Sequence, residues 1–180
     1  LLAKQINDMI VWINLNLDTS MTLKEYNRLN VILTDIYNDF GITDDNDSIF
    51  EDLKAKKLKK MPILGDLYDH IVNIPELSRI KDSLEIYIHG NCQNMNGQTN
   101  IDLDNPYIVF DVDEDNIGER LLAAFLFPVY KFVYGVIKAI SGMFDDSYAE
   151  MNSTPAFYSI SSAVFMDEVW KAMKNRQSAE

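Results

Sequence analysis

The chain has 180 residues, of which 47% are hydrophobic, and this content is sufficient for a sizeable packed core. Sixteen basic residues against twenty-eight acidic ones give a formal net charge of −12. A chain with this charge repels nucleic acid on average, so a nucleic-acid contact would need a local basic patch. The only basic cluster is KAKKLKK, Lys54–Lys60, which has no interleaved aromatic residues. We expect it to form a solvated helical face or a frayed helix end, with a polyanion contact as the alternative.

Cysteine and histidine are too few for several kinds of site. Cys92 is the only cysteine, so no internal disulfide can form and a cytosolic-type environment is expected. His70 and His89 are the only histidines, which excludes the usual zinc-ligand spacing. Cys92 and His89 lie three residues apart, but no neighbouring group orients them as a nucleophile and base.

The first forty residues predict two helices. Apolar residues recur at steps of three or four and form one stripe over residues 2–17: Leu2, Ile6, Met9, Ile10, Ile13 and Leu17. Thr22 and Glu25 have the spacing of a capping box, which predicts a second helix that begins at this point. Gly41 is then expected to end that helix in a left-handed conformation.

Further capping signals bring the expected number of helices in the first ninety residues to about five. Ser48 and Glu51 repeat the capping-box spacing. Pro62 predicts the start of a helix through ILGDLYDHIVNI, and Pro75 the start of one through ELSRIKDSLEIYI. The last helix is expected to stop at Gly90.

After Gly90 the pattern changes from helical to mixed. A stretch rich in Asn, Gly and Asp precedes an apolar strand at 106–112, PYIVFDV. A long apolar helix is expected over 119–141, followed by a polar connector at 141–155. A second strand at 161–166 then leads into another helix. Strands that alternate with helices predict a piece of parallel sheet.

The most apolar segment, Leu121–Ile140, has about the length of a membrane span. Lys131 and Lys138 interrupt it, and Pro128 lies inside it. These interruptions favour a helix buried in an α/β domain.

Two acidic runs were compared with the calcium-binding EF-hand loop, which needs Gly at its sixth position and Glu at its twelfth. The run from Asp44 has Ile49 and Ala55 at those positions. The run from Asp111 has Asn116 and Leu122. We therefore expect solvated loop charges at both places.

The stretch SSAVFMDEVWKAM places two carboxylates, Asp167 and Glu168, directly after an apolar run. In P-loop nucleotide hydrolases an apolar strand ends in an Asp that holds magnesium, generally through water, and a following Glu can polarise the attacking water. Ligands bind parallel sheets at this end of the strands. The alternative is a helix whose first turn carries two favourable acids.

The partner of such a strand, the phosphate-binding motif G-x-x-x-x-G-K-[ST], does not occur in the chain, because no glycine is followed by lysine. We expect this motif to lie upstream of Leu1, so that the chain is a fragment of a longer protein. The 180 residues alone are then expected not to hydrolyse ATP.

Several segments in order resemble one family: MPILGDLYDHI, LEIYIHGNCQNMNGQTNIDLDNPYIVFDV, AAFLFPVYKFVYGVIK and SSAVFMDEVW. They are similar to the motor domain of the VirB-type (TraC/TraE-like) ATPases of conjugation and type IV secretion. The resemblance covers nearly the whole chain, and its most specific parts are the turn from Tyr87 to Gly90, the segment from QTNIDL to IVFDV, and MDEVW. The later glutamine and arginine elements that sense the γ-phosphate are absent, and the connector at 141–155 is longer than the family pattern.

The resemblance implies an α/β fold, predominantly helical overall, in which a helical subdomain is inserted in a partial RecA-like parallel sheet. Residues 1–90 would form the helical subdomain, with the insertion itself from about residue 20, and residues 91–180 the partial RecA-like segment. By position, Asp167 matches the magnesium-associated acid of the ATP site and Glu168 the catalytic acid.

The resemblance also implies oligomers at the cytosolic side of a membrane channel, with other subunits of the transfer machine as partners. The first hypothesis is therefore a fragment of an ATPase that powers DNA or protein transfer and pilus assembly. The second is a non-catalytic helical module that binds proteins, in which the acid pair only caps a helix.

Overall fold

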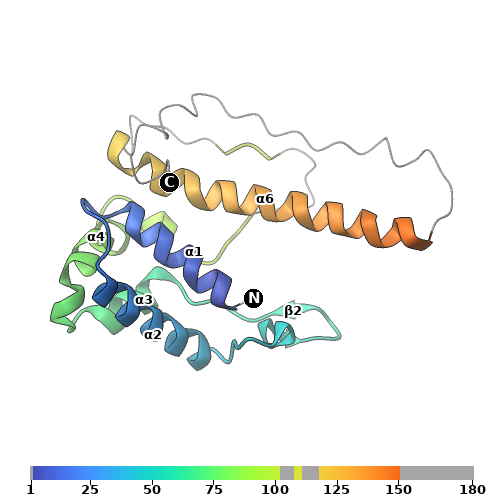
Figure 1. Ribbon diagram of the computed structural model, residues 1–180, viewed down its shortest axis with the longest axis horizontal. Coiled ribbons are helices and arrows are strands. Elements are labelled where there is room, and N and C mark those ends of the chain that lie inside the picture. Colours follow the sequence, from blue (N-terminus) through green and yellow to red (C-terminus); the bar gives the residue numbers. More distant parts are fainter. Residues whose placement is uncertain (1, 102–107, 111–117, 151–180) are drawn as a thin grey trace. The chain divides into compact units, whose positions relative to one another are not determined.

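The computed structural model describes residues 2–101, 108–110 and 118–150, and this part of the chain is predominantly helical (Figure 1). The chain divides into two compact units, Leu1–Ile108 and Val109–Glu180. The first unit contains α1 (Leu2–Leu15), α2 (Leu23–Asp39), α3 (Leu64–Ile71) and α4 (Ser78–Ile88), with the 3-10 helices η1 (Asn46–Ile49), η2 (Pro75–Leu77) and η3 (Gln93–Met95) and the strands β1 (Phe50–Asp52) and β2 (Lys57–Leu58). The second contains α6 (Glu119–Glu150).

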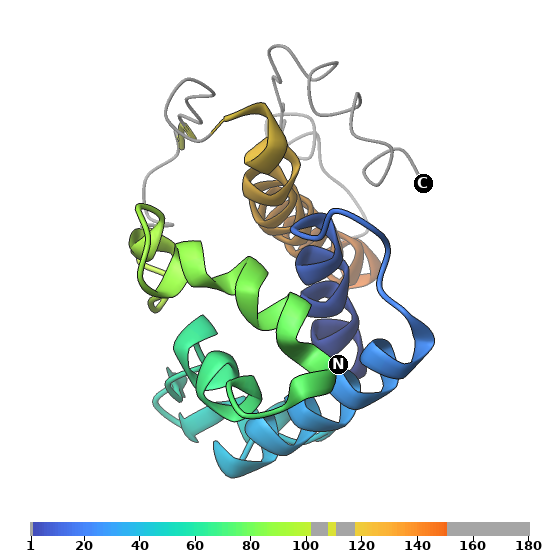
Figure 2. The same ribbon diagram turned by 90° about the vertical axis from the view of Figure 1, so that its left-hand side faces the viewer.

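The core of the first unit lies among α1–α4, which gather around a shared interior (Figures 1 and 2). α1 packs on α2, α2 on α3, and α3 on α4. The largest side chains that are fully buried are Ile13, Leu29, Ile36, Ile71, Leu77, Ile80, Leu84 and Tyr87. The stripe predicted for the first helix is confirmed for Leu2, Ile6, Ile10 and Ile13, which are all buried. Met9 is half-buried, and Leu17 is buried but lies beyond the end of α1. Burial of these apolar side chains is the main stabilising term of the unit.

Both ends of α2 are as the sequence predicts. At the start, Thr22 Oγ1 accepts the backbone N–H of Glu25 at 3.2 Å, and the Glu25 carboxylate accepts the N–H of Thr22 at 2.8 Å. At the end, Gly41 has φ +68°, its N–H donates to the carbonyl of Asn38, and the N–H of Ile42 donates to that of Tyr37. These two bonds are those of the Schellman motif, so the left-handed glycine cap is confirmed.

The helices predicted after Pro62 and Pro75 are present with shifted starts. α3 begins at Leu64, two residues beyond Pro62, and the Asp66 carboxylate accepts the N–H of Ile63 at 2.7 Å. Pro75 opens η2, which leads directly into α4. α4 ends before Gly90, where a Cβ would lie 2.7 Å from both the Cα and the carbonyl oxygen of Ile86. Only glycine fits this close approach, which confirms the predicted stop.

The helix expected after Ser48, and the helical reading of Lys54–Lys60, are wrong. η1 is followed by an antiparallel hairpin in which Phe50 lies opposite Leu58 and Asp52 opposite Lys57. The Asp52 carboxylate accepts the N–H groups of Lys54 and Ala55, at 2.9 and 3.0 Å. Such local bonds from an aspartate to the backbone compete with a helix and favour a turn.

α6 is longer than the predicted helix over 119–141, because it continues to Glu150 through the first part of the expected connector at 141–155. Gly142 is the only glycine in this extension, and one glycine inside a helix costs only about 1 kcal/mol. Pro128 lies within α6. Within the described ranges, no helix is both long and apolar enough to cross a membrane.

The sheet of the described residues consists of β1 and β2 alone. Ile108–Phe110, the described part of the strand expected at 106–112, forms no strand. Val109 is 88% exposed, so a buried strand at this position is wrong. The strand expected at 161–166 lies outside the described residues.

Candidate functional site

The two acids predicted for the ATP site, Asp167 and Glu168, lie outside the described residues. The described residues contain no group of three or more His, Cys, Asp or Glu side chains arranged to hold a metal ion. The acidic run that begins at Asp44 has a structural role, because the Asp45 side chain accepts the N–H of Asp47 at 3.0 Å and caps η1. The Asp111 run lies outside the described residues.

Two of the segments quoted for the family resemblance are joined by side-chain hydrogen bonds. Gln98 accepts the N–H of Met61 at 3.1 Å and donates to the Met61 carbonyl at 2.6 Å. Asn96 Oδ1 accepts the N–H of Gly65 at 2.9 Å. A Cβ at Gly65 would lie 3.3 Å from Asn96 Nδ2, so the amide lies tightly against the start of α3. We call these three bonds the amide clamp.

The amide clamp fixes the backbone ahead of α3 and in its first turn, across 31 to 37 residues of sequence. Backbone groups that lie before a helix have no partner inside it and need side chains or water. The segments MPILG and NMNGQ therefore depend on each other in this fold.

A second polar group ties the starts of α2 and α4 to the loop between α1 and α2. Arg79 donates to both oxygens of Glu25, from Nε at 3.1 Å and from Nη2 at 2.9 Å. Its Nη1 donates to Thr19 Oγ1 at 2.5 Å. Glu25 is only 7% exposed. The Arg79 guanidinium, assisted by Thr22, lowers the pKa of Glu25 from its ordinary value of 4.5 to about 2, against the opposing effect of burial. This group serves the fold, because each of its bonds joins one element to another.

A third polar group lies inside the core. The Tyr87 hydroxyl donates to Asn16 Oδ1, and Asn16 Nδ2 donates to the Trp12 carbonyl at 2.8 Å. The rings of Trp12 and Tyr87 are 5.1 Å apart. Burial, with a smaller contribution from Cys92, raises the pKa of Tyr87. Tyr87 opens the turn that is specific to the resemblance, and its position at the centre of the core gives that residue a structural role.

Cys92 does not have the environment of a nucleophile. It is 4% exposed, and burial raises the pKa of its thiol. The reactive form of cysteine is the thiolate, so a raised pKa reduces reactivity. The His89 ring packs edge-on against Tyr68, with centroids 5.6 Å apart.

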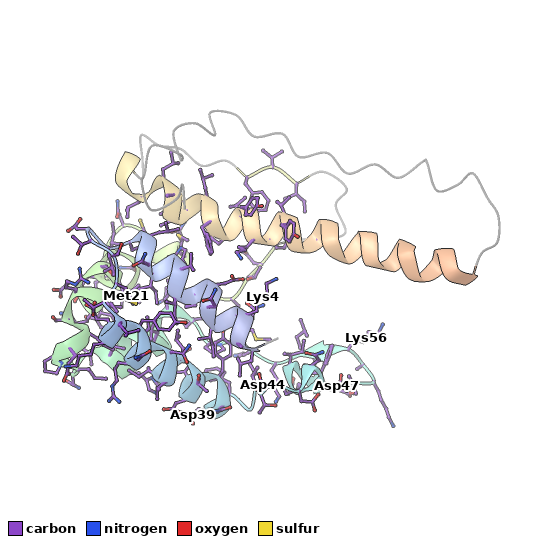
Figure 3. The ribbon with its side chains drawn as sticks, in the orientation of Figure 1. Lys4, Met21, Asp39, Asp44, Asp47 and Lys56 are labelled. Carbon is purple, nitrogen blue, oxygen red and sulfur yellow. The ribbon has the colours of Figure 1, made fainter. Side chains whose placement is uncertain are left out.

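Another polar feature of the first unit is the β1–β2 hairpin, residues 50–58, with the lysines on and after it. Figure 3 shows Lys56 at the turn, away from α1–α4, and Asp44 and Asp47 near the base. Lys56 has φ +52°, an uncommon conformation for a residue other than glycine. Two lysines bind within the unit: Lys57 Nζ lies 2.6 Å from Glu51 Oε2, and Lys59 Nζ donates to the Gly41 carbonyl at 2.7 Å.

Lys54, Lys56 and Lys60 are all exposed and form no ion pair with any described residue. Two large apolar side chains of the same segment are also exposed, Leu53 by 52% and Leu58 by 56%. We call these five residues the hairpin surface. Exposed lysines and leucines within one short segment are residue types that suit a binding surface.

α6 carries exposed aromatic residues in the second unit. The rings of Tyr130 and Tyr134 stack with centroids 6.2 Å apart and are 55% and 51% exposed. Lys131 Nζ lies 5.4 Å from the centroid of the Phe127 ring. The segment Leu121–Ile140 is therefore not buried along its whole described length.

Sequence reasoning missed all three polar groups and the hairpin. Only the Thr22–Glu25 half of the Glu25–Arg79 group has a signal in the sequence, since a capping box has a fixed spacing. Arg79, Asn96 and Gln98 have none, because they reach their partners across 31 to 60 residues. No protein-family model, no curated protein and no solved structure matches this chain.

Proposed function

We propose that the chain is part of the motor domain of a VirB-type ATPase of conjugation or type IV secretion. In this proposal residues 1–90 form the helical subdomain, with the insertion itself from about residue 20. The segment that follows belongs to a RecA-like parallel sheet. The whole protein would hydrolyse ATP with magnesium to power DNA or protein transfer and pilus assembly.

The amide clamp is the observation that carries the proposal. MPILG and NMNGQ belong to separate motifs of the resemblance, and their side chains and backbone bond to each other. A chance likeness in two distant segments would not need to be structurally interdependent. The folded helical unit Leu1–Ile108, with its own core, also supports a subdomain of this kind.

The proposed chemistry rests on the carboxylates that follow the expected strand at 161–166. Asp167 would hold magnesium through water, and Glu168 would polarise the water that attacks the γ-phosphate. The phosphate cradle would come from a segment that is not in this sequence. The motor would work as an oligomer in the cytoplasm, at the inner face of the membrane, with other subunits of the transfer machine as partners.

The test uses the protein encoded by the complete reading frame that contains this chain. Glu168→Gln should abolish ATP turnover, while binding of a fluorescent ATP analogue with magnesium is retained, because the base is lost but the phosphate and metal contacts are not. Asp167→Asn should instead weaken magnesium-dependent binding.

Glu76→Gln is the matched control, since Glu76 is a half-exposed carboxylate on η2 that pairs only loosely with Lys24, at 3.8 Å. This variant should turn over ATP at the wild-type rate. Unchanged turnover in Glu168→Gln would remove that residue from the mechanism. A complete protein that binds no nucleotide would overturn the motor proposal as a whole.

The second candidate is a helical module that binds other proteins and has no catalytic activity. The observation that favours it is that the buried and paired charges of the helical unit, such as Glu25 and Arg79, serve the fold, while its unpaired lysines face outward. Nucleotide binding by the complete protein separates the two candidates.

A further inference from the structure

The hairpin surface differs in charge from the rest of the molecule. Five of the sixteen lysine and arginine residues lie within Lys54–Lys60, while the whole chain has a net charge of −12. The net charge of the molecule therefore repels an anionic surface, whereas the lysines of this segment attract it. Charges more than about 10 Å away are largely screened at moderate salt, so the local charge decides the contact.

The contacts inside the hairpin leave three lysines available to a partner. Glu51 is neutralised by Lys57, and the Asp52 carboxylate faces the N–H groups of its own turn. Lys54, Lys56 and Lys60 form no ion pair with any described residue. Asp44 and Asp47 lie toward the base and not at the turn (Figure 3).

Leu53 and Leu58 add an apolar component to the same segment. Each is more than half exposed, although a leucine in this unit gains free energy from burial. Leucines beside lysines suit a surface that has anionic groups outside and hydrocarbon beneath.

We propose that the hairpin surface binds anionic phospholipid membranes, with the lysines at the headgroups and the leucines at the acyl boundary. Nucleic acid fits less well, because the segment has no aromatic residue between its lysines on which a base could stack. A second copy of the chain, whose acids include the run from Asp44, is the other anionic partner, and the self-association measurement below distinguishes it from a membrane. The binding would hold whether or not the chain belongs to a motor.

The experiment is co-sedimentation of the 180-residue chain with vesicles of mixed phosphatidylglycerol and phosphatidylcholine, at low and moderate salt. A lysine near an anionic surface strengthens binding roughly fivefold, so the triple variant Lys54→Gln, Lys56→Gln, Lys60→Gln should bind roughly a hundredfold more weakly. Leu53→Ser with Leu58→Ser should weaken binding about tenfold at unchanged charge. Binding should fall as salt rises.

The matched control is Lys4→Gln, Lys24→Gln, Arg28→Gln, which removes the same charge from exposed positions of α1 and α2. It should bind nearly as the wild type does. Because all the substituted side chains are exposed, circular dichroism should show that each variant folds. Equal loss of binding in the two triple variants would overturn the proposal, as would equal binding to pure phosphatidylcholine vesicles.

Two further measurements distinguish a membrane from the other possible partners. Binding of a short DNA duplex that depends on the three hairpin lysines, without vesicle binding, would replace the membrane with nucleic acid. Salt-sensitive self-association that depends on the same lysines, without vesicle binding, would replace it with a second copy of the chain.

Discussion

The α1–α4 bundle and the β1–β2 hairpin belong to the same compact unit but use their residues in opposite ways. In the bundle most leucines are buried, although Leu23 is 75% exposed, and the buried carboxylate of Glu25 is paired with Arg79 of another element. In the hairpin, leucines are more than half exposed and three lysines have no ion pair with any described residue. A two-stranded hairpin is at best marginally stable alone, so it depends on the bundle that holds it. Stability and surface chemistry therefore come from separate segments of one unit: the bundle provides the buried core, and the hairpin provides exposed lysines and leucines.

The largest effect should come from removing a buried leucine. Leu84→Ala is expected to reduce the free energy of unfolding by about 3 kcal/mol, because Leu84 is fully buried and its loss leaves a cavity. Leu53→Ala, the same substitution in the hairpin, should change it by less than about 0.5 kcal/mol. Urea unfolding followed by circular dichroism measures both. Equal effects would mean that the hairpin belongs to the core, and the distinction between the two regions would fail.

An intermediate effect should follow from neutralising Glu25. Glu25→Gln retains the shape of the side chain but loses the charge that meets Arg79, and should destabilise the unit by about 1 to 2 kcal/mol at neutral pH. The lower part of this range is favoured because the Arg79 side chain is 41% exposed and water screens the pair.

The pH dependence of the unfolding free energy tests the contact between Glu25 and Arg79 more sharply. The folded-state pKa of Glu25 is lowered to about 2, below the ordinary value of 4.5, so its stabilisation is fully present above pH 4.5 and is lost as pH falls toward 2. The difference in unfolding free energy between wild type and Glu25→Gln should therefore shrink across this window. A constant difference down to pH 2 would show that the charge contributes nothing.

Among the destabilising substitutions, the smallest loss of stability is expected at Gly41, where the bundle contacts the segment after the hairpin. Gly41 has φ +68°, and its carbonyl accepts a hydrogen bond from Lys59 after the hairpin. Gly41→Ala should destabilise the unit by about 1 kcal/mol, because the left-handed conformation strains any residue with a Cβ. Gly97→Ala is the matched control, since a Cβ there meets nothing within 4 Å and no positive φ constrains it. Thermal unfolding of both variants should separate them, and an equal loss would argue against strain at Gly41.

Sequence patterns were reliable where the responsible groups are near in the chain. The stripe of α1, the Thr22–Glu25 capping box and the Gly41 cap all depend on residues within a few positions of each other, and all are confirmed. The Ser48–Glu51 spacing failed although it is also local. There the side chains of Asp45 and Asp52 hold backbone groups in turns, and the same spacing no longer starts a helix.

The candidate sites also differ in how much of each the sequence predicts. The Asp167–Glu168 pair is a prediction of the sequence alone, and the lysine cluster was visible in it as a run of charge. The sequence does not show that this cluster forms a hairpin with three unpaired lysines. The contacts of Lys57 with Glu51 and of Lys59 with the Gly41 carbonyl depend on how the chain turns.

By itself the sequence determined the helical character of most of the first ninety residues, the β1–β2 hairpin excepted, together with the ends of α2 and the stop of α4 before Gly90. These follow from periodicity and from backbone groups that seek partners nearby. Only the tertiary structure decided which distant polar groups meet: Arg79 with Glu25, Tyr87 with Asn16, and Gln98 with Met61. The physical reason is that burial raises the demand for a partner but does not specify where in the chain that partner lies.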